Sequence, residues 1–497
     1  MAAAEPIDLL VIGGGINGAG IARDAAGRGL SILLCEKDDL AAHTSSASTK
    51  LIHGGLRYLE QYEFRLVAEA LREREVLLKA APHIVWPLRF VLPHDRTMRP
   101  KWMLRAGLLL YDVLGGFGRT LPGSRAIRLD RATHRPVLQD RLTRGFEYSD
   151  CWVDDARLVV LNAMDAKARG AQIRTRTECV ALERLPDRWR ATLKSASSER
   201  VIEARAVVNA AGPWVDGVAR QALGKGTQAH LRLVKGSHIV VPHAYPGDHA
   251  YILQQPDGRI VFAIPYERDF TLIGTTDEPF SGDPGAVSIS DSEIDYLVAA
   301  VGRSFRSGVT RDEIVWSYSG VRPLYEDKAR SSSTVTRDYV FELDAENGAP
   351  ILSIYGGKIT TFRRLAEHAL KRLAKHLPIG PAWTGDAPLP GGEMADFAQF
   401  LWDASGRHRW LPPEMLQRLA RAYGTRLDTV IGDARSLEDL GEHLGGTLYE
   451  AELRYLIRDE FAGTAEDTLW RRSKLGLHLG RDSVAAVERW FADNSPA

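Results

Sequence analysis

Cysteine is scarce in this sequence. The chain of 497 residues has 3 cysteines, Cys35, Cys151 and Cys179, and no two of them have C-x-x-C spacing. A disulfide framework and a cysteine-based zinc site are therefore not expected, whereas a reducing compartment is. Two histidines in loop-like segments, His243 and His249, lack partners at metal-ligand spacing. We therefore predict no metal site.

An excess of one charge is also missing, and so are long apolar runs. The 64 lysines and arginines equal the 64 aspartates and glutamates, which argues against a nucleic-acid-binding protein because such proteins are usually basic. No segment approaches the roughly 18 consecutive apolar residues that a membrane-spanning helix needs. The first residues lack the charged segment and apolar core of a secretory or transit peptide. We expect a chain that is soluble or bound to one face of a membrane.

A glycine-rich turn, by contrast, is present close to the N-terminus. Residues 9–12 form a short apolar run typical of a buried parallel strand, and an alanine-rich helical segment and a second strand at 31–35 follow. Between the first strand and the helix lie glycines with G-x-G-x-x-G spacing, Gly13, Gly15 and Gly18. Such glycines let a pyrophosphate approach the backbone, and an acid at the position of Glu36 bonds a ribose. The pattern predicts a dinucleotide site rather than a plain strand–helix–strand packing unit.

The order of the segments predicts an α/β fold with interleaved domains. A Rossmann-like dinucleotide-binding part opens the chain, a part rich in alternating, antiparallel strands interrupts it, and a strand with a Gly-Gly turn resumes it at 351. A linker then leads to an all-helical C-terminal domain. The expected ranges are 1–75, 150–228 and 351–386 for the dinucleotide-binding domain, 76–149 and 229–350 for the substrate domain, and 391–497 for the helical domain.

This interleaving favours FAD over NAD, because NAD dehydrogenases usually keep the dinucleotide domain contiguous. The stretch TSSASTKLIHGG at 44–55 also suits the longer cofactor, since its hydroxyls and small residues can line FAD along its length. An ordinary polar loop is the alternative interpretation of this stretch, and its composition alone does not decide between them.

A family resemblance is carried by segments from residue 7 to the C-terminal helical region. They are GGGINGAG, SSASTKLIHGGLRYLE, EYSDCWVDDARLV, NAAGPWVD, KGSHIVVP, IGTTD, YSGVRPL, TRDY and GGKITT. Together they resemble the FAD-dependent, quinone-linked glycerol-3-phosphate dehydrogenases of bacteria. The resemblance implies oxidation of sn-glycerol 3-phosphate to dihydroxyacetone phosphate and transfer of electrons to a membrane quinone. It also implies a cytoplasmic protein attached peripherally to the inner face of the cytoplasmic membrane, with a homodimer as a further expectation.

The cofactor contacts that we expect lie in the glycine turns and in the polar stretch that follows the first of them. They are Gly13, Gly15, Ile16, Asn17, Gly18, Glu36, Ser45, Ser46, Thr49, Lys50, Leu51, His53, Gly54, Val180, Gly212, Trp214, Gly357, Lys358 and Thr360. Among these, Lys358 precedes a predicted helix and suits the negative charge that develops on a reduced flavin.

A phosphate monoester calls for arginine, whose planar fork binds two oxygens at once. Three arginines, Arg57, Arg322 and Arg337, match positions of the family's substrate arginines. A surface or structural ion pair is the alternative for each of them. Tyr58, beside Arg57, is a further candidate for a substrate hydrogen bond, with core packing as its alternative.

The proton of the substrate hydroxyl needs an acceptor, and His238 in KGSHIVV is the leading candidate. A histidine satisfied within the sheet is the alternative, and an alcohol polarised by arginine with another group as base stays open. Expected catalytic residues are therefore His238, Arg322 and Lys358, of which Lys358 also counts among the substrate contacts.

Other functions remain as alternatives. They are an oxidase of the same fold that uses oxygen, an amine- or amino-acid-oxidising flavoenzyme, and a flavin-binding sensor or scaffold without catalysis. The segment 98–119 leaves two interpretations open, since its apolar helical face with cationic edges suits either a membrane surface or a buried helix.

Overall fold

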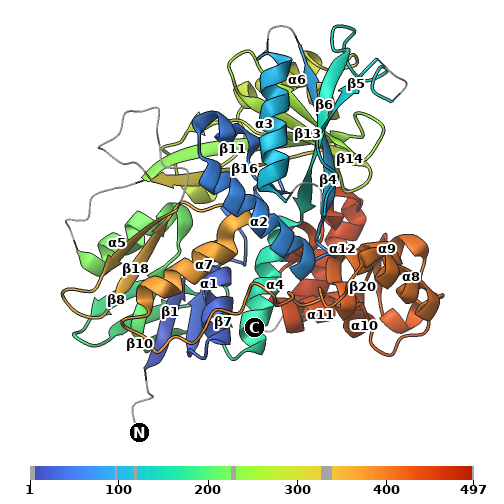
Figure 1. The fold of residues 1–497 in the computed structure, drawn as a ribbon. Helices are drawn as coiled ribbons and strands as arrows, with labels where there is room; N and C mark the ends of the chain where they lie inside the picture. The colour runs from blue at the N-terminus through green and yellow to red at the C-terminus, as the bar shows by residue number, and fades with distance from the viewer. Residues whose placement is uncertain are drawn as a thin grey trace.

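The fold contains two large sheets and a C-terminal group of helices (Figure 1). It was obtained as a computed structural model, which describes residues 6–95, 98–116, 120–130, 133–224, 231–325 and 339–494, except for the side chains of Arg57 and Gln61.

The first sheet has eight strands, and its middle is parallel. The strand order is β17–β18–β10–β1–β2–β7, and the β8–β9 hairpin joins it through β10. The strands are β1 Ile7–Ile12, β2 Ile32–Cys35, β7 Gln172–Arg174, β8 Glu178–Arg184, β9 Trp189–Lys194, β10 Glu199–Asn209, β17 Val340–Asp344 and β18 Ile351–Tyr355. In β1, Leu9 and Val11 face one hydrophobic core, while Leu10 and Ile12 face another. Burial of both faces explains the uninterrupted apolar run.

Helices cover this sheet on both faces. On one face α1 Ile16–Gly27 packs between α4 Asp155–Ala168 and α7 Phe362–Leu373, and on the other α5 Val215–Leu223 packs against β8. These elements come from three separate parts of the chain, as the blue, green and orange ribbons in the lower left of Figure 1 show.

The second sheet has ten strands in the order β15–β11–β14–β13–β12–β4–β6–β3, with β16 on β11 and β5 on β6. They are β3 Leu51–Ile52, β4 Val85–His94, β5 Arg125–Arg128, β6 Arg144–Val153, β11 Leu231–Pro242, β12 Ala250–Gln254, β13 Ile260–Tyr266, β14 Phe270–Gly274, β15 Glu278–Pro279 and β16 Trp316–Tyr325. Its pairs are antiparallel, as predicted, except β12 with β4. A second difference is that β17, inside the range expected for this sheet, pairs with β18 of the first sheet instead.

Three helices flank the second sheet. The helices α2 Phe64–Ala80 and α3 Lys101–Leu114 share a core with one face, and α6 Asp291–Gly302 shares a core with the other. Figure 1 shows α3 standing beside β4 and β6, with α2 crossing below it towards the first sheet.

The C-terminal part is mainly helical but not entirely so. Its helices are α8 Phe397–Arg407, α9 Pro413–Tyr423, α10 Leu427–Ile431, α11 Glu450–Glu460 and α12 Arg481–Asn494, and the π-helical turn η9 Asp467–Arg472 precedes α12. A small hairpin, β19 His443–Gly445 with β20 Leu448–Tyr449, corrects the expectation of an all-helical domain. None of the described helices is both long and apolar enough to cross a membrane.

Short helical turns occur throughout the chain. They are η1 Thr44–Ser46, η2 Leu56–Gln61, η3 Gly212–Trp214, η4 Pro284–Ala286, η5 Arg311–Glu313, η6 Ile359–Thr361, η7 Gly424–Arg426, η8 Glu438–Leu440 and η10 Leu475–Leu477.

Candidate active site

A cavity of about 560 Å³ runs from the first glycine turn to strands β11 and β16 of the second sheet. Most of the predicted contacts line it. They are Gly13, Gly15, Ile16, Asn17, Glu36, Ser45, Thr49, Leu51, His53, Gly54, Tyr58, Gly212, Trp214, His238, Arg322, Gly357, Lys358 and Thr360. A long ligand with a phosphate-rich middle would fill such a continuous space, as FAD does.

The first glycine turn depends on close backbone approach. A Cβ on Gly18 would lie 1.9 Å from the carbonyl oxygen of Gly13, so α1 can start this close to β1 only without a side chain there. Gly13 itself has φ +111°, a conformation that favours glycine. Gly18 is absent from the described cavity lining, and its effect on a cofactor is therefore through the position of α1. At the helix start the hydroxyl of Ser45 accepts from the N–H of Ile16 at 3.0 Å.

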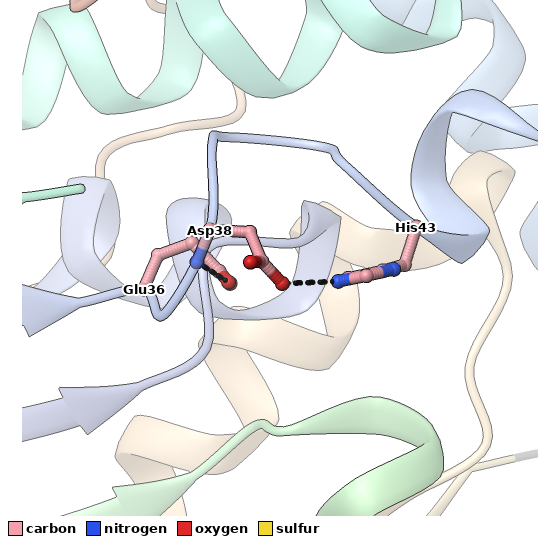
Figure 2. Close-up of side chains that lie close together, drawn as sticks. All are labelled: Glu36, Asp38 and His43. Carbon is pink, nitrogen blue, oxygen red and sulfur yellow. Dashed lines mark hydrogen bonds and ion pairs between the residues drawn. The ribbon is translucent and has the colours of Figure 1, made fainter. Parts of the chain in front are cut away.

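Glu36 directly follows β2 and lines the cavity, and its side chain is drawn in Figure 2. Its carboxylate accepts from the backbone N–H groups of Gly14 at 2.6 Å and Asp38 at 2.9 Å. Burial raises its pKa, and these two hydrogen bonds act in the opposite direction. A carboxylate has about four acceptor positions, so capacity remains for ribose hydroxyls.

The imidazole of His43 lies 2.7 Å from Asp38, beside Glu36 (Figure 2). One ligand atom from each of these three side chains falls within 4.8 Å of the others, an arrangement that a cation could occupy. Glu36 and His43 line the cavity in which we predict a dinucleotide, and His43 and Asp38 are already hydrogen-bonded to each other. The cluster therefore carries no separate metal assignment.

Two predicted contacts in the polar stretch after η1 point elsewhere. The ammonium of Lys50 forms a buried ion pair with Asp155 at 2.6 Å and donates to the carbonyl of Ser46 at 3.0 Å. Ser46 lines a neighbouring pocket on the other side of this stretch, and neither residue is among the described residues that line the cavity. The buried ammonium of Lys50 is thus paired with a carboxylate, as burial of a charge requires, and cofactor contacts of Lys50 and Ser46 stay predictions.

The predicted cofactor contact at Val180 is one through the backbone, and it stays a prediction. Its side chain on β8 is 37% exposed, its carbonyl accepts a hydrogen bond from Gln221, and it too is absent from the described lining. Its neighbours Thr177, Glu178 and Cys179 line the cavity instead.

The last glycine turn closes the cavity near the first. The side-chain amide of Asn17 donates to the carbonyl of Gly356 at 3.1 Å and so ties α1 to this turn. The other amide atom, Oδ1, is buried without a partner among the described residues, and Asn17 lines the cavity. Lys358 follows, with its ammonium 4.0 Å from the ring centre of Tyr58. Burial and the charge of Lys358 lower the pKa of His53 to about 4, which keeps that imidazole neutral.

His238 lies in β11 between β14 and β16 and is 2% exposed. Its ring stacks on Tyr318 with centroids 4.8 Å apart, and its Nε2 is 3.0 Å from the hydroxyl of Thr49. A Cβ on Gly274 would lie 2.0 Å from the ring, so glycine there makes room for the imidazole. Burial, with smaller contributions from Lys50 and Arg322, lowers the pKa of His238 to about 3.

Arg322 supplies a guanidinium from β16 at the same end. It donates to the carbonyl of Thr276 at 3.2 Å and to Asp277 at 3.1 Å, and its side chain remains 44% exposed. These two hydrogen bonds orient the guanidinium. Several of its N–H donors remain available to an anion. The side chain of Arg57 and the whole of Arg337 lie outside the described residues.

Sequence reasoning missed a supporting carboxylate, Glu293 of α6. Burial alone would raise its pKa, but hydrogen bonds from Lys235, Thr276 and Ser237 lower it to about 2. These bonds fix Ser237 and Thr276 beside His238 and Arg322. The capping-box pattern S-x-x-E that opens α6 was the available signal, although it indicates a helix start and says nothing of the tertiary partners.

Known families match nearly the whole chain. The description "FAD dependent oxidoreductase" matches residues 8–363, and "C-terminal domain of alpha-glycerophosphate oxidase" matches residues 382–492. The chain belongs to the FAD-dependent oxidoreductase family. FAD is its cofactor, and the continuous cavity fits that molecule.

Curated relatives of this oxidoreductase cover it from end to end. A glycerol-3-phosphate dehydrogenase of Pseudomonas aeruginosa is 53% identical over 99% of this chain and 96% of its own. A D-erythritol 1-phosphate dehydrogenase of Brucella abortus is 52% identical over 100% and 99%. The aerobic glycerol-3-phosphate dehydrogenase of Escherichia coli is 49% identical over 98% of both chains.

Among solved structures, the glycerol-3-phosphate dehydrogenase from Bacillus halodurans complexed with FAD has a TM-score of 0.79 and 30% identity, over 99% of this chain and 91% of that one. The family resemblance inferred from the motifs is confirmed by these matches, and so is the α/β class of the fold.

Proposed function

We propose that this oxidoreductase oxidises sn-glycerol 3-phosphate to dihydroxyacetone phosphate. The observation that carries the proposal is that Arg322, Lys358 and His238 line the same cavity as the FAD-binding turns. A phosphate monoester needs cations, and the oxidation of a secondary alcohol needs a proton acceptor beside the flavin. The names of the relatives in Pseudomonas aeruginosa and Escherichia coli support the same substrate.

Each of these residues has a distinct role in the proposal. Bound FAD supplies an acceptor for the hydride of C2. Arg322 binds the phosphate through its planar fork, with Arg57 and Arg337 as further predicted phosphate ligands. Lys358, with its ammonium 4.0 Å from the ring centre of Tyr58, brings positive charge to the start of η6. That charge stabilises the anion that forms when the cofactor is reduced.

D-Erythritol 1-phosphate is a second candidate substrate. The Brucella abortus relative named for it is 52% identical to this chain, against 53% for the Pseudomonas aeruginosa relative. Both substrates join a phosphate ester to neighbouring hydroxyls, so the same cations and proton acceptor serve either one.

Anaerobic titration of the yellow purified protein tests the proposal. We expect glycerol 3-phosphate to bleach the flavin absorbance, and a comparison of initial rates with D-erythritol 1-phosphate to identify the preferred substrate. Glycine and proline should leave the flavin oxidised. Bleaching by amino acids alone would contradict the proposal in favour of an amino-acid-oxidising enzyme, and no bleaching by any substrate would favour a flavin-binding scaffold.

The electron acceptor that we propose is a quinone in the cytoplasmic membrane, reached through an apolar patch on α3 and the neighbouring start of α2. The patch consists of exposed large apolar side chains, Tyr62, Phe64, Trp102, Met103, Leu109, Leu110 and Val113. Exposed apolar area of this kind favours an apolar partner over water.

Basic residues beside the patch favour an anionic lipid surface. Lys101 is exposed at the start of α3, and Arg99 is 53% exposed, although its charge is partly offset by Glu60 at 3.2 Å. Arg105 donates to Ser124 and is half-buried, and Arg119 lies outside the described residues.

The buried side of α3 supports a short route for electrons. Tyr111 of α3 accepts from the N–H of Gly54, a cavity-lining residue, at 2.8 Å. The patch is thus separated from the cofactor cavity by about the diameter of one helix, roughly 10–12 Å.

Co-sedimentation with vesicles that contain phosphatidylglycerol tests this surface. We expect Trp102→Ser with Val113→Ser to lower vesicle binding and quinone reduction while anaerobic flavin reduction persists. Trp402→Ser, on the 75% exposed tryptophan of α8, is the matched control and should bind normally. Unchanged vesicle binding of the double variant would overturn the proposed membrane-binding surface.

The expected homodimer and the domain ranges also remain proposals. Sedimentation velocity tests the homodimer, and limited proteolysis tests the domain ranges.

A further inference from the structure

His238 lines the cavity but is only 2% exposed, and its two ring nitrogens have different surroundings. Nδ1 is buried and has no hydrogen-bond partner among the described residues. Nε2 is 3.0 Å from the hydroxyl of Thr49, which is half-buried and lines the cavity itself. Thr49 therefore presents to the cavity a hydroxyl that already lies within hydrogen-bond distance of Nε2.

The position of Thr49 is fixed on both sides by buried interactions. Its predecessor Ser48 donates to Asp155 at 2.7 Å, and its successor Lys50 binds the other oxygen of Asp155 at 2.6 Å. Tyr318, the residue on which His238 stacks, donates from its hydroxyl to the carbonyl of Ser48 at 2.8 Å. These contacts hold the hydroxyl of Thr49 and the imidazole in one rigid arrangement.

We propose that Thr49 is a catalytic residue that passes the proton of the substrate hydroxyl to His238. This inference rests on the proposed function, the oxidation of a secondary alcohol. The Thr49 hydroxyl accepts the proton from the C2 hydroxyl of the substrate while it donates its own proton to Nε2. The hydride leaves C2 for the flavin with its electron pair, and the carbonyl forms between C2 and oxygen. C2 is oxidised, the flavin is reduced, and the imidazolium later returns its proton to water.

A weak base is sufficient for this transfer. As the hydride leaves, the remaining oxygen-bound proton becomes strongly acidic, because it would otherwise sit on a carbonyl oxygen. Burial next to Lys50 keeps His238 neutral, with a pKa of about 3, and in the tautomer that carries its hydrogen on Nδ1 the Nε2 atom is the acceptor for the Thr49 hydroxyl. The neighbouring cations also favour rapid release of the proton afterwards.

Matched variants distinguish this catalytic role of Thr49 from a purely structural one. Thr49→Val keeps the shape but removes the hydroxyl, and Thr49→Ser keeps the hydroxyl. We expect Thr49→Val to slow anaerobic flavin reduction by about 10²-fold or more, the lower range for general acid–base catalysis, and Thr49→Ser to restore most of that loss. Both variants should retain FAD, measured by the ratio of flavin to protein absorbance.

The combination with His238→Gln tests whether the two residues act as one unit. In a relay the double variant Thr49→Val/His238→Gln is no slower than the His238→Gln variant, since the route is already interrupted. A proton inventory, in which the rate of flavin reduction is measured against the fraction of deuterium in the solvent, gives a second test. It should be curved in the wild type, where two protons move in the transition state, and lose this curvature in Thr49→Val.

Near-normal reduction by Thr49→Val, or additive losses in the double variant, would overturn the relay. If neither glycerol 3-phosphate nor D-erythritol 1-phosphate reduces the flavin of the wild-type protein, the proposed function is overturned instead. The failure of the relay and the failure of the proposed function are therefore distinguishable.

Discussion

At the scale of single residues, the substrate end of the cavity depends on a histidine kept neutral by burial. The pKa of His238 is lowered to about 3 by burial, with Lys50 and Arg322 contributing in the same direction. Because a lowered pKa delays protonation, the ring should stay neutral as the pH falls from 8 to 5. NMR of histidine labelled with ¹³C at Cε1, assigned with His238→Gln, measures this. A titration midpoint near 6.5 for His238 in the FAD-bound protein would contradict the assignment.

Among the described cavity residues, Arg322 is the one that we propose to contribute most to phosphate recognition. Arg322→Lys keeps the charge but loses the planar fork, so we expect kcat/KM for glycerol 3-phosphate to fall roughly 10- to 100-fold, as hydrogen bonds to charged groups contribute about 1.5–3 kcal/mol. FAD content should be unchanged. Arg128→Lys, on an exposed arginine of β5 paired with Asp130, is the control and should be silent. Normal kcat/KM in Arg322→Lys would remove this residue from the phosphate site.

The residues of the candidate site were predictable from sequence where a motif determines the backbone. Gly13 and Gly357 follow directly from glycine spacing, and both line the cavity. The ion pair of Lys50 with Asp155 was not predicted, because Asp155 is distant in the sequence. The pairing of His238 with Thr49 was missed for the same reason, since β11 and the stretch after η1 meet only in the folded protein.

At the scale of elements, the glycine turn at the start of α1 has two different requirements. A Cβ on Gly18 would lie 1.9 Å from a backbone oxygen, whereas a Cβ on Gly15 would meet only the Ser45 hydroxyl at 3.1 Å. We expect Gly18→Ala to destabilise the FAD-free protein by about 1–3 kcal/mol, as overpacking does. Gly15→Ala should leave that stability nearly unchanged but weaken FAD binding. Thermal unfolding with and without FAD checks both, and equal melting temperatures of the two FAD-free variants would contradict this distinction.

Among the elements, strongly patterned ones were predicted well. The apolar run of β1 and the glycine turn before α1 lie where the sequence indicates. The partner of β17 was not predictable, because an alternating strand fits the edge of either sheet and only the tertiary fold selects one. The parallel pair of β12 with β4 likewise joins segments that are far apart in the sequence.

At the scale of the whole molecule, buried ion pairs attach the C-terminal part to the FAD-binding part. Arg472 of η9 binds Asp39 at 2.6 Å, with 0% and 2% of the side chains exposed. Asp39 lies in the segment that follows Glu36. Asp39 also pairs with Arg471 at 2.7 Å, so Arg472→Gln removes one of its two charge partners, and we expect a loss of stability below about 3–5 kcal/mol, the cost of a fully broken buried pair.

Urea unfolding measures this loss. Arg458→Gln is the control, since Arg458 is 62% exposed and pairs with Asp459 at the surface, where such pairs contribute about 0–1 kcal/mol. Equal stability of the two variants would contradict a role for Arg472 in attaching the C-terminal part.

The central claim is that one cavity brings the C2 hydrogen of a polyol phosphate to FAD. Stopped-flow reduction by glycerol 3-phosphate deuterated at C2 tests it most directly. We predict rapid anaerobic bleaching of the flavin, slowed several-fold by deuterium at C2, because that C–H bond breaks in the reduction step. Absence of bleaching would contradict the central claim. So would a bleaching rate that deuterium at C2 leaves unchanged, even in the Thr49→Val variant, in which the chemical step is expected to be rate-limiting.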